Sequence, residues 1–205
     1  MNQQTRIGLQ NLAPGFKDPQ LDSQRVFRQV LQAMARPGHI VAIDRLPEAP
    51  GPLGGGTAAL ALTLLDLDTP VWLSPEVRDT ASDYLSFHTG APLTAELGAA
   101  AFVLVADGNK LPDLSQLALG DAEYPERGAT IIVQVERLRI APGRRLRGPG
   151  ILGHVDISVD GLAEEFWPAL HANRQRFPLG FDTLLVAGDL VLGLPRTIML
   201  DPGEG

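Results

Sequence analysis

Four short runs of apolar residues in the second half of the chain constrain its fold more than any other feature. Each run is five or six residues long and is dominated by Val, Ile, Leu and Ala. Runs of this length without polar alternation are typical of strands that are covered on both faces of a sheet. We therefore predict buried strands at Ala101–Val105, Thr130–Val135, Thr183–Ala187 and Leu190–Leu194.

Helix-like segments alternate with these runs, which favours an α/β layered fold. The predicted helices are Thr57–Leu65, with Thr57 as the capping residue, Val77–His88, Leu111–Leu119 and Gly161–Ala172, and a short strand is predicted at Pro70–Ser74. The Gly188-Asp189 pair between the last two runs indicates a tight antiparallel hairpin. The predicted architecture is therefore a three-layer one, with a mixed β-sheet flanked by helices.

The segment Gly15–Ile40 combines a turn, a helix and a stop signal. The oxygens of Asp22 and Ser23 can accept hydrogen bonds from the first amides of a helix, so we expect the helix to begin near Asp22. Pro37-Gly38 ends it, and His39 to Ile43 reads as a strand. The predicted buried stripe has helical spacing and consists of Val26, Phe27, Val30, Leu31 and Met34.

Composition limits the classes of protein to which the chain can belong. Its 205 residues suit one domain, and we predict an N-terminal arm at 1–14 followed by a single α/β domain at 15–205. Neither a membrane-length apolar run nor a secretion signal is present, so we expect a soluble, cytoplasmic protein. A formal charge of -7 argues against nucleic-acid binding, and the lack of cysteine excludes disulfides and thiolate chemistry.

An arginine cluster precedes a glycine-rich turn. Five arginines, namely Arg137, Arg139, Arg144, Arg145 and Arg147, are followed by Gly148, Gly150 and Gly153. Guanidinium forks and glycine amides bind phosphate or phosphonate oxygens, so the cluster can be an anion site. The alternatives are a solvated hairpin or an edge that contacts another subunit. The spacing G-x-G-x-x-G carries little weight because Pro149 removes an amide and no helix is expected to follow.

The remaining polar residues suggest structural roles. None of the four histidines, His39, His88, His154 and His171, has a partner at metal-ligand spacing on one helix, and no metal site is predicted. His88, near a predicted helix end, is the histidine with the best claim to a binding role. Asp66, Asp68 and Thr69 can order a turn or bind magnesium. Arg196 can pair with a carboxylate or contact a ligand.

Several segments, in collinear order, resemble the PhnH family of the bacterial carbon-phosphorus lyase system, which breaks down phosphonates. The resemblance begins with the Asp18-Pro19 and Asp22-Ser23-Gln24 signals and covers nearly the whole chain. The other matching segments are LALTLLDLDTPVWLS (60–74), FHTGAP (87–92), GATIIVQV (128–135), LRGPGI (146–151) and RFPLGFDTLLVAGDLVLGLPRT (176–197).

The resemblance implies a scaffold similar to that of pyridoxal-phosphate-dependent transferases, without the cofactor. Such an enzyme needs a lysine that forms an imine with the cofactor. The two lysines of this chain are Lys17, in a turn, and Lys110, in a loop that reads as exposed. Neither position suits a buried catalytic lysine, so no cofactor is expected.

The resemblance also implies a function. It predicts an accessory, non-catalytic subunit that supports attachment of an alkylphosphonate to the ribose of a nucleoside triphosphate, together with subunits G, I and J and with itself as a homodimer. An iron-sulfur cluster needs thiolates that this sequence lacks. The candidate site for a phosphonate or nucleotide ligand comprises Arg145, Arg147, Gly148, Gly150 and His88, and no catalytic residue is assigned. The alternatives are a pyridoxal-phosphate-type transferase and a nucleotide-binding or phosphonate-binding regulatory module.

Overall fold

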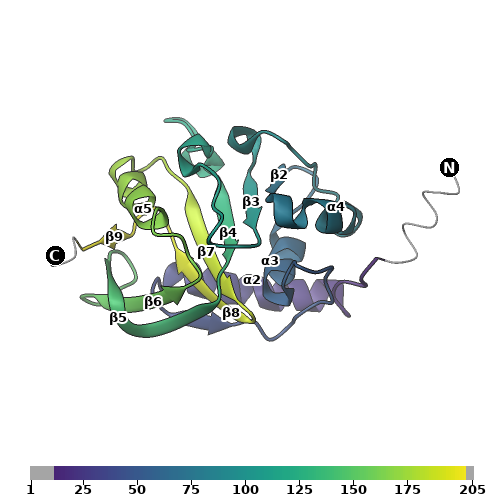
Figure 1. Ribbon diagram of the computed structural model, residues 1–205, viewed down its shortest axis with the longest axis horizontal. Helices are drawn as coiled ribbons and strands as arrows, with labels where there is room; N and C mark the ends of the chain where they lie inside the picture. The colour runs from purple at the N-terminus through teal and green to yellow at the C-terminus, as the bar shows by residue number, and fades with distance from the viewer. Residues whose placement is uncertain (1–11, 202–205) are drawn as a thin grey trace, which may run out of the picture.

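The computed structural model describes residues 12–201, and its central element is a six-stranded mixed sheet (Figure 1). Strands β2, β3, β4 and β7 are parallel, β8 is antiparallel to β7, and β1 is antiparallel to β8. In spatial order the strands are β1 (Ile40–Ala42), β8 (Leu190–Leu194), β7 (Asp182–Ala187), β4 (Thr130–Gln134), β3 (Phe102–Val105) and β2 (Val71–Leu73).

Different elements cover the two faces of this sheet. Helices α2 (Pro19–Ala35), α3 (Gly55–Leu64) and α4 (Pro75–Thr89) lie on one face. The other face is covered by α5 (Phe166–Gln175), by the 3₁₀ turns η1 (Leu97–Ala99) and η2 (Leu114–Gln116), and by a second sheet of β6 (Val155–Asp160), β5 (Arg137–Arg147) and β9 (Met199–Leu200). A third 3₁₀ turn, η3, spans Pro125–Arg127.

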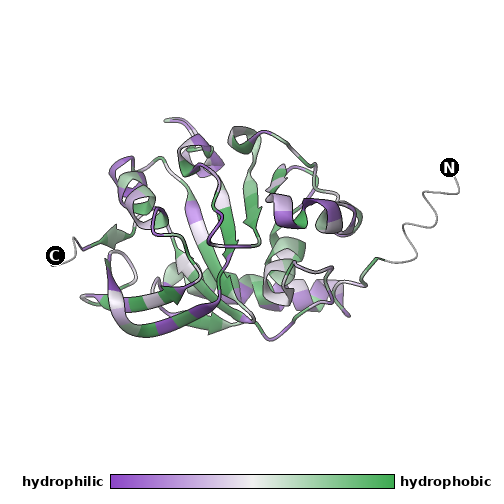
Figure 2. Cartoon of the chain, viewed as in Figure 1, coloured by the Kyte–Doolittle hydropathy of each residue, from purple (hydrophilic) through white to green (hydrophobic). Residues whose placement is uncertain are grey.

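Alternation along β4 shows how the sheet divides the core. Ile132 packs in the cluster beneath the three helices, whereas Ile131 and Val133 pack in the cluster on the opposite face. Successive side chains of a strand point to opposite faces, and both faces here are apolar. Figure 2 accordingly shows the central strands mostly in the hydrophobic colour, while β5 carries many hydrophilic residues.

The predicted buried strands are confirmed to within one residue at each end by β3, β4, β7 and β8. The predicted hairpin is also confirmed, because β7 and β8 pair from Thr183–Leu194 to Ala187–Leu190. Gly188 occupies its turn with φ of 63°, a conformation that side-chain-bearing residues rarely adopt. None of the helices within residues 12–201 has the length and apolarity needed to cross a membrane.

The predicted start of the first helix is wrong by three residues. The helix begins at Pro19, and Asp18 is its N-cap, accepting a hydrogen bond from the Leu21 N–H at 3.1 Å. Proline suits the first helical position because its missing N–H would have no partner there. Asp22 lies inside the first turn, where its carboxylate accepts from the Asp18 N–H and pairs with Arg45 at 3.2 Å.

The predicted apolar stripe of α2 is also partly wrong. Val26 and Val30 are buried, but Phe27 and Leu31 are 45% and 51% exposed. A Cβ on Gly193 of β8 would lie only 2.6 Å from the Ala33 carbonyl oxygen, so the helix packs closely against the sheet here. This close packing centres the buried face on the valines and Ala33 and turns the larger side chains outward.

Three further helix predictions need correction. Thr57 does not cap α3, because Gly54 is the N-cap and Thr57 is buried within the first turn. The segment Leu111–Leu119 forms only the turn η2, which Asp113 opens by accepting from the Ser115 N–H at 3.0 Å. The helix expected at Gly161–Ala172 is α5, which begins later because Gly161 adopts a φ of 76° that continues no right-handed helix.

The predicted N-terminal arm, residues 1–14, lies mostly outside the described residues. Of its last three residues, Leu12 and Ala13 pack against the cluster beneath the helices.

Candidate functional site

The arginine cluster lies along β5, the long central strand of the small sheet. Each of its five guanidinium groups has a carboxylate partner. The pairs are Arg137 with Asp160 (3.8 Å), Arg139 with Asp160 (2.8 Å), Arg144 with Glu164, Arg145 with Asp156 (2.8 Å) and Arg147 with Asp201 (2.8 Å). The cluster therefore forms a row of ion pairs across and beside the sheet.

Arg145 and Arg147, the two predicted anion ligands, both use more than one hydrogen bond. Arg145 donates from Nε and Nη2 to the two oxygens of Asp156, and Arg147 Nε donates to both oxygens of Asp201. The hydrogen bond from Arg145 holds the pKa of Asp156 below its usual value, with a further contribution from the nearby His154. An incoming anion would have to compete with these carboxylates, and the anion site remains a prediction.

The glycines after β5 allow close packing against the end of α2. A Cβ on Gly150 would lie 2.4 Å from the Ala35 carbonyl oxygen. The turn leads into β6 and not into a helix, so the G-x-G-x-x-G spacing has no dinucleotide-binding context. Beside the turn is a hollow of about 330 Å³ that brings Gly150 together with His39 and His154. The spacing of residues in the sequence gave no sign of this grouping, because His39 is more than 100 positions before Gly150 and His154.

His88 lies apart from the arginine cluster. It belongs to the last turn of α4, beneath the opposite face of the main sheet. Its Nε2 lies 2.9 Å from the Ala13 carbonyl oxygen and, since a carbonyl only accepts, donates to it. The ring also packs edge-on against Tyr84 and contacts the backbone turn at Gly15. The structure thus does not bring His88 together with the other predicted site residues.

Neither lysine fits the chemistry of a pyridoxal-phosphate site. Lys17 is exposed in the turn before α2. Lys110 follows β3, with Nζ 3.3 Å from Asp107 and 3.6 Å from Glu76, and its side chain is 62% exposed. Hydrogen bonding and charge from Asp107, then charge from Glu76, raise the pKa of Lys110. A more firmly protonated ammonium is a poorer nucleophile for imine formation.

The acidic turn at Asp66–Thr69 and Arg196, the remaining candidates, both have partners within the fold. Asp66 accepts from the Asp68 N–H at 3.0 Å, and Thr69 bonds the Asp66 backbone, so these residues order the turn between α3 and β2. Within residues 12–201 no set of three or more His, Cys, Asp or Glu side chains is placed to hold a metal ion. Arg196 pairs with Asp182 at 2.6 Å and donates to the Pro125 carbonyl at 2.6 Å.

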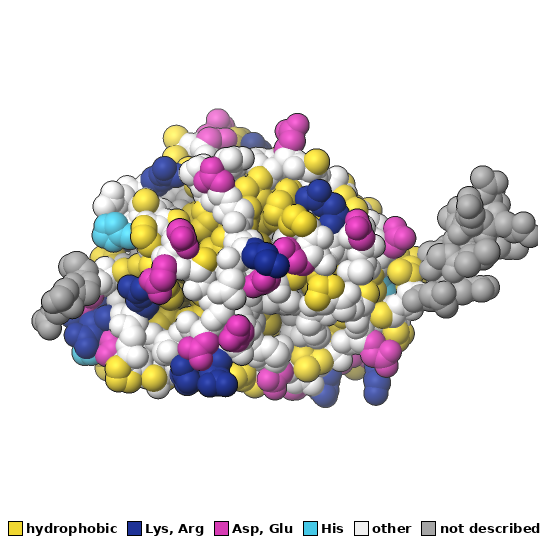
Figure 3. Space-filling model, viewed as in Figure 1, with side chains coloured by type: hydrophobic (Ala, Val, Ile, Leu, Met, Phe, Trp, Pro, Cys, Tyr) yellow, Lys and Arg dark blue, Asp and Glu magenta, His cyan; other side chains and the backbone are white. Residues whose placement is uncertain are grey.

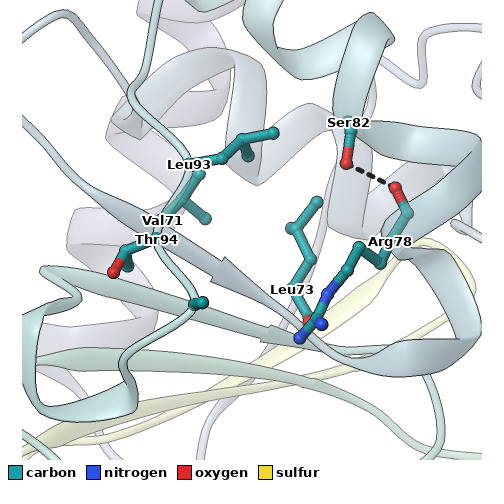
Figure 4. A pocket seen from close by; sticks show the side chains of 7 residues that line it. Val71, Leu73, Arg78, Ser82, Leu93 and Thr94 are labelled. Atoms are coloured by element: carbon teal, nitrogen blue, oxygen red, sulfur yellow. Dashed lines mark hydrogen bonds between the residues drawn. The ribbon is translucent and has the colours of Figure 1, made fainter.

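A hollow that the sequence did not reveal lies beside β2, an end strand of the main sheet (Figure 4). Its volume is about 240 Å³, and its lining is mainly apolar. The lining residues come from β2, α4 and the segment after α4, and they are Val71, Leu73, Arg78, Ser82, Leu93, Thr94 and Ala95. Figure 4 shows Leu93 on one side of the hollow, with Leu73 and Arg78 facing it. On the face seen in Figure 3, hydrophobic side chains gather near β3, β4 and α4 within a ring of charged ones.

Arg78 supplies the charge of this hollow. Its Nη2 donates to the Leu73 carbonyl at 3.1 Å, and its guanidinium lies 5.7 Å from the centre of the Trp72 ring. Ser82 donates from its hydroxyl to the Arg78 carbonyl one helical turn earlier. The sequence places Arg78 on a polar helix face, and only the path of the segment 93–95 turns that face into a hollow.

Comparison with known proteins gives consistent results over nearly the full chain. Residues 14–201 match the family described as bacterial phosphonate metabolism protein (PhnH). The chain is 42% identical over 187 residues to the "Alpha-D-ribose 1-methylphosphonate 5-triphosphate synthase subunit PhnH" of Rhizobium meliloti (strain 1021), covering 91% of this chain and 94% of that protein. It is 37% identical over 175 residues to the "Putative C-P lyase subunit protein HtxG" of Stutzerimonas stutzeri, covering 85% and 83% of the two chains.

Proposed function

Because the chain belongs to the PhnH family of bacterial phosphonate metabolism proteins, we propose that it is an accessory, non-catalytic subunit of a carbon-phosphorus lyase assembly. The assembly joins an alkylphosphonate to the ribose of a nucleoside triphosphate. The observation that carries this proposal is the 42% identity, along almost the whole of both chains, to a protein named as a subunit of α-D-ribose 1-methylphosphonate 5-triphosphate synthase.

The chemistry of the side chains supports an accessory role over a catalytic one. The sequence contains no cysteine, so it supplies no thiolate for an iron-sulfur cluster. Lys110 is held as an ammonium by two carboxylates, and the β5 arginines are engaged with carboxylates. These groups stabilise the fold and its surface, and they leave no activated nucleophile among them.

The partners follow from the same proposal. We expect the chain to assemble with subunits G, I and J in the cytoplasm, and to pair with itself when it is purified alone. A phosphonate or nucleotide ligand would then be bound by the assembly, with Arg145 and Arg147 as the candidate contacts on this chain.

Co-expression tests the proposal. The chain should co-elute with subunits G, I and J on size exclusion. The assembly should form α-D-ribose 1-methylphosphonate 5-triphosphate from methylphosphonate and a nucleoside triphosphate, and yield should fall when this chain is omitted. The purified chain alone should form no product and should scatter light as a dimer.

Two results would overturn the accessory role. One is turnover of methylphosphonate or a nucleoside triphosphate by the isolated chain. The other is an unchanged yield from an assembly that lacks it. Calorimetry of the isolated chain with ATP separates the regulatory alternative, because a nucleotide-binding module would give heat of binding and the accessory subunit should give none.

A further inference from the structure

The main sheet has an edge that is only partly covered. At β2, the Val71 N–H donates to the Pro92 carbonyl at 2.9 Å, and the Thr94 N–H donates to the Val71 carbonyl at 3.0 Å. In the described part of the chain this backbone pairing ends at Thr94. Alternate residues of a strand direct their backbone groups to the same side, so the Leu73 N–H and carbonyl also face this edge.

Arg78 bonds one of the two Leu73 backbone groups that face this edge, and the Leu73 N–H is the other. Its Nη2 donates to the Leu73 carbonyl at 3.1 Å, in the place where the N–H of a neighbouring strand would donate. The Leu73 N–H faces the hollow side of the edge without a bonded carbonyl in residues 12–201. An open sheet edge of this kind can accept an extended segment from another chain, which would supply a carbonyl oxygen to that N–H.

The hollow at this edge has an aliphatic lining that suits one apolar side chain. Val71 and Leu73 form its floor and are themselves buried, whereas Leu93 on the opposite side is 45% exposed. A volume of about 240 Å³ lies below the roughly 300–1,000 Å³ of pockets that bury whole small-molecule ligands. The dimensions therefore favour a side chain of a larger partner over a nucleotide.

Arg78 places a positive charge at the hollow. Arg78 is the charged residue of the lining, and within residues 12–201 no carboxylate lies within ion-pair distance of it. The β5 arginines, in contrast, all have such partners. A guanidinium beside an apolar surface binds a carboxylate in a fixed, forked geometry, which makes the site selective for an acidic group next to an aliphatic one.

We infer that the open edge of β2, the aliphatic hollow and Arg78 together form a docking site for an extended segment of a partner subunit that carries an aliphatic side chain next to a carboxylate. This inference rests on the proposed function, because the partner is a member of the assembly. The aliphatic side chain enters between Leu73 and Leu93, the carboxylate binds Arg78, and a backbone carbonyl accepts from the Leu73 N–H.

Charge reversal in the co-expressed assembly tests the inference. Arg78→Glu should weaken binding of the chain to subunits G, I and J by about 30-fold or more, since a charge pair is replaced by repulsion. Arg25→Glu is the matched control. Arg25 is an exposed helical arginine without an ion pair among the described residues, and its reversal should leave affinity within about twofold. Affinities are measured by surface plasmon resonance on the immobilised subunits.

Hydrogen exchange gives a second, independent readout on the unsubstituted chain. The Leu73 amide should exchange more slowly in the assembly than in the isolated chain. If Arg78→Glu does not fold, Leu93→Asp replaces it, because Leu93 is exposed and its substitution disrupts only the wall of the hollow.

The outcomes separate the two proposals. If the unsubstituted chain does not bind the other subunits, the proposed function and this inference both fail. If it binds, but the Arg78 and Leu93 variants bind equally well and the Leu73 amide is not protected, the docking site alone is overturned. Binding of free methylphosphonate that Arg78→Glu abolishes, with assembly unchanged, would also overturn it by assigning the hollow to a small ligand.

Discussion

The six-stranded sheet and the small β5–β6–β9 sheet use polar residues in opposite ways. The large sheet is buried on both faces, and its strands carry almost continuous apolar side chains. The small sheet exposes one face, where five arginines of β5 pair with four carboxylates. A dense run of arginines is thus neutralised within the chain, whereas the single arginine at the edge of the large sheet, Arg78, has no carboxylate partner among residues 12–201.

The core of the large sheet should show the largest effect. Ile132→Ala should lower the free energy of unfolding by about 2–5 kcal/mol, because Ile132 is fully buried in the central strand β4 and its truncation leaves a cavity. Ile140→Ala on β5 is the control, and with a 57% exposed side chain it should change the free energy by no more than about 0.5 kcal/mol. Urea unfolding measures both. Equal costs would contradict the distinction between the two sheets.

An ion pair at the large sheet should also contribute more to the free energy of unfolding than an ion pair on the small sheet. Arg196→Gln should cost about 3 kcal/mol, because the Arg196 and Asp182 side chains are only 12% and 21% exposed and Asp182 would lose its partner. Arg139→Gln should cost less than about 1 kcal/mol, because Arg139 and Asp160 are 44% and 38% exposed and water screens the pair. The same urea experiment applies, and a cost for Arg139→Gln as large as for Arg196→Gln would refute the comparison.

The buried Tyr84 should make the stability of the chain depend on pH in the alkaline range. Its hydroxyl donates to the Glu48 carbonyl at 3.0 Å, and burial raises its pKa to about 12. At neutral pH, Tyr84→Phe should cost about 1 kcal/mol for the lost hydrogen bond. In the unfolded chain the pKa of the Tyr84 phenol is near 10. The buried, protonated Tyr84 therefore stabilises the fold below pH 10, and this contribution is lost as pH rises from 10 to 12. Unfolding curves across this range should show a steeper loss for the unsubstituted chain than for Tyr84→Phe.

The smallest effect should come from Asp156, a partly exposed acid of the small sheet. Asp156 has a lowered pKa, chiefly because Arg145 donates to it, so it stabilises the fold above its unfolded pKa near 3.9 and loses that contribution as pH falls further. Asp156→Asn should therefore reduce the fall in thermal stability between pH 5 and pH 2. In a chain that already carries Arg145→Gln, Asp156→Asn should change this fall in thermal stability less. If Asp156→Asn alone leaves the fall between pH 5 and pH 2 unchanged, the Arg145–Asp156 pair contributes nothing to stability.

Local signals were sufficient for much of the fold. The apolar runs located β3, β4, β7 and β8, and the Gly188-Asp189 pair located the hairpin between β7 and β8. Strand burial and tight turns can be predicted because each depends on the types of a few consecutive residues. The same signals failed at Leu111–Leu119, where the helical spacing of leucines competes with the turn that Asp113 opens. They also failed on the face of α2, since the approach of Gly193 decides which side is buried.

The candidate site was less accessible from sequence. Arg145 and Arg147 were visible as a cluster, but their partners Asp156 and Asp201 lie 11 and 54 positions further along the chain. Arg78 gave no signal, because its setting depends on the end of β2 and on Leu93, which a whole helix separates in the chain.

The amino-acid sequence by itself determined the positions of the buried strands β3, β4, β7 and β8, the hairpin and the membership of the PhnH family, since each depends on residue types in local or collinear order. Tertiary structure alone decided which arginines are neutralised and which one faces an open edge. Electrostatic pairing depends on distances of a few ångströms in space, and strand register and helix packing set these distances independently of separation along the chain.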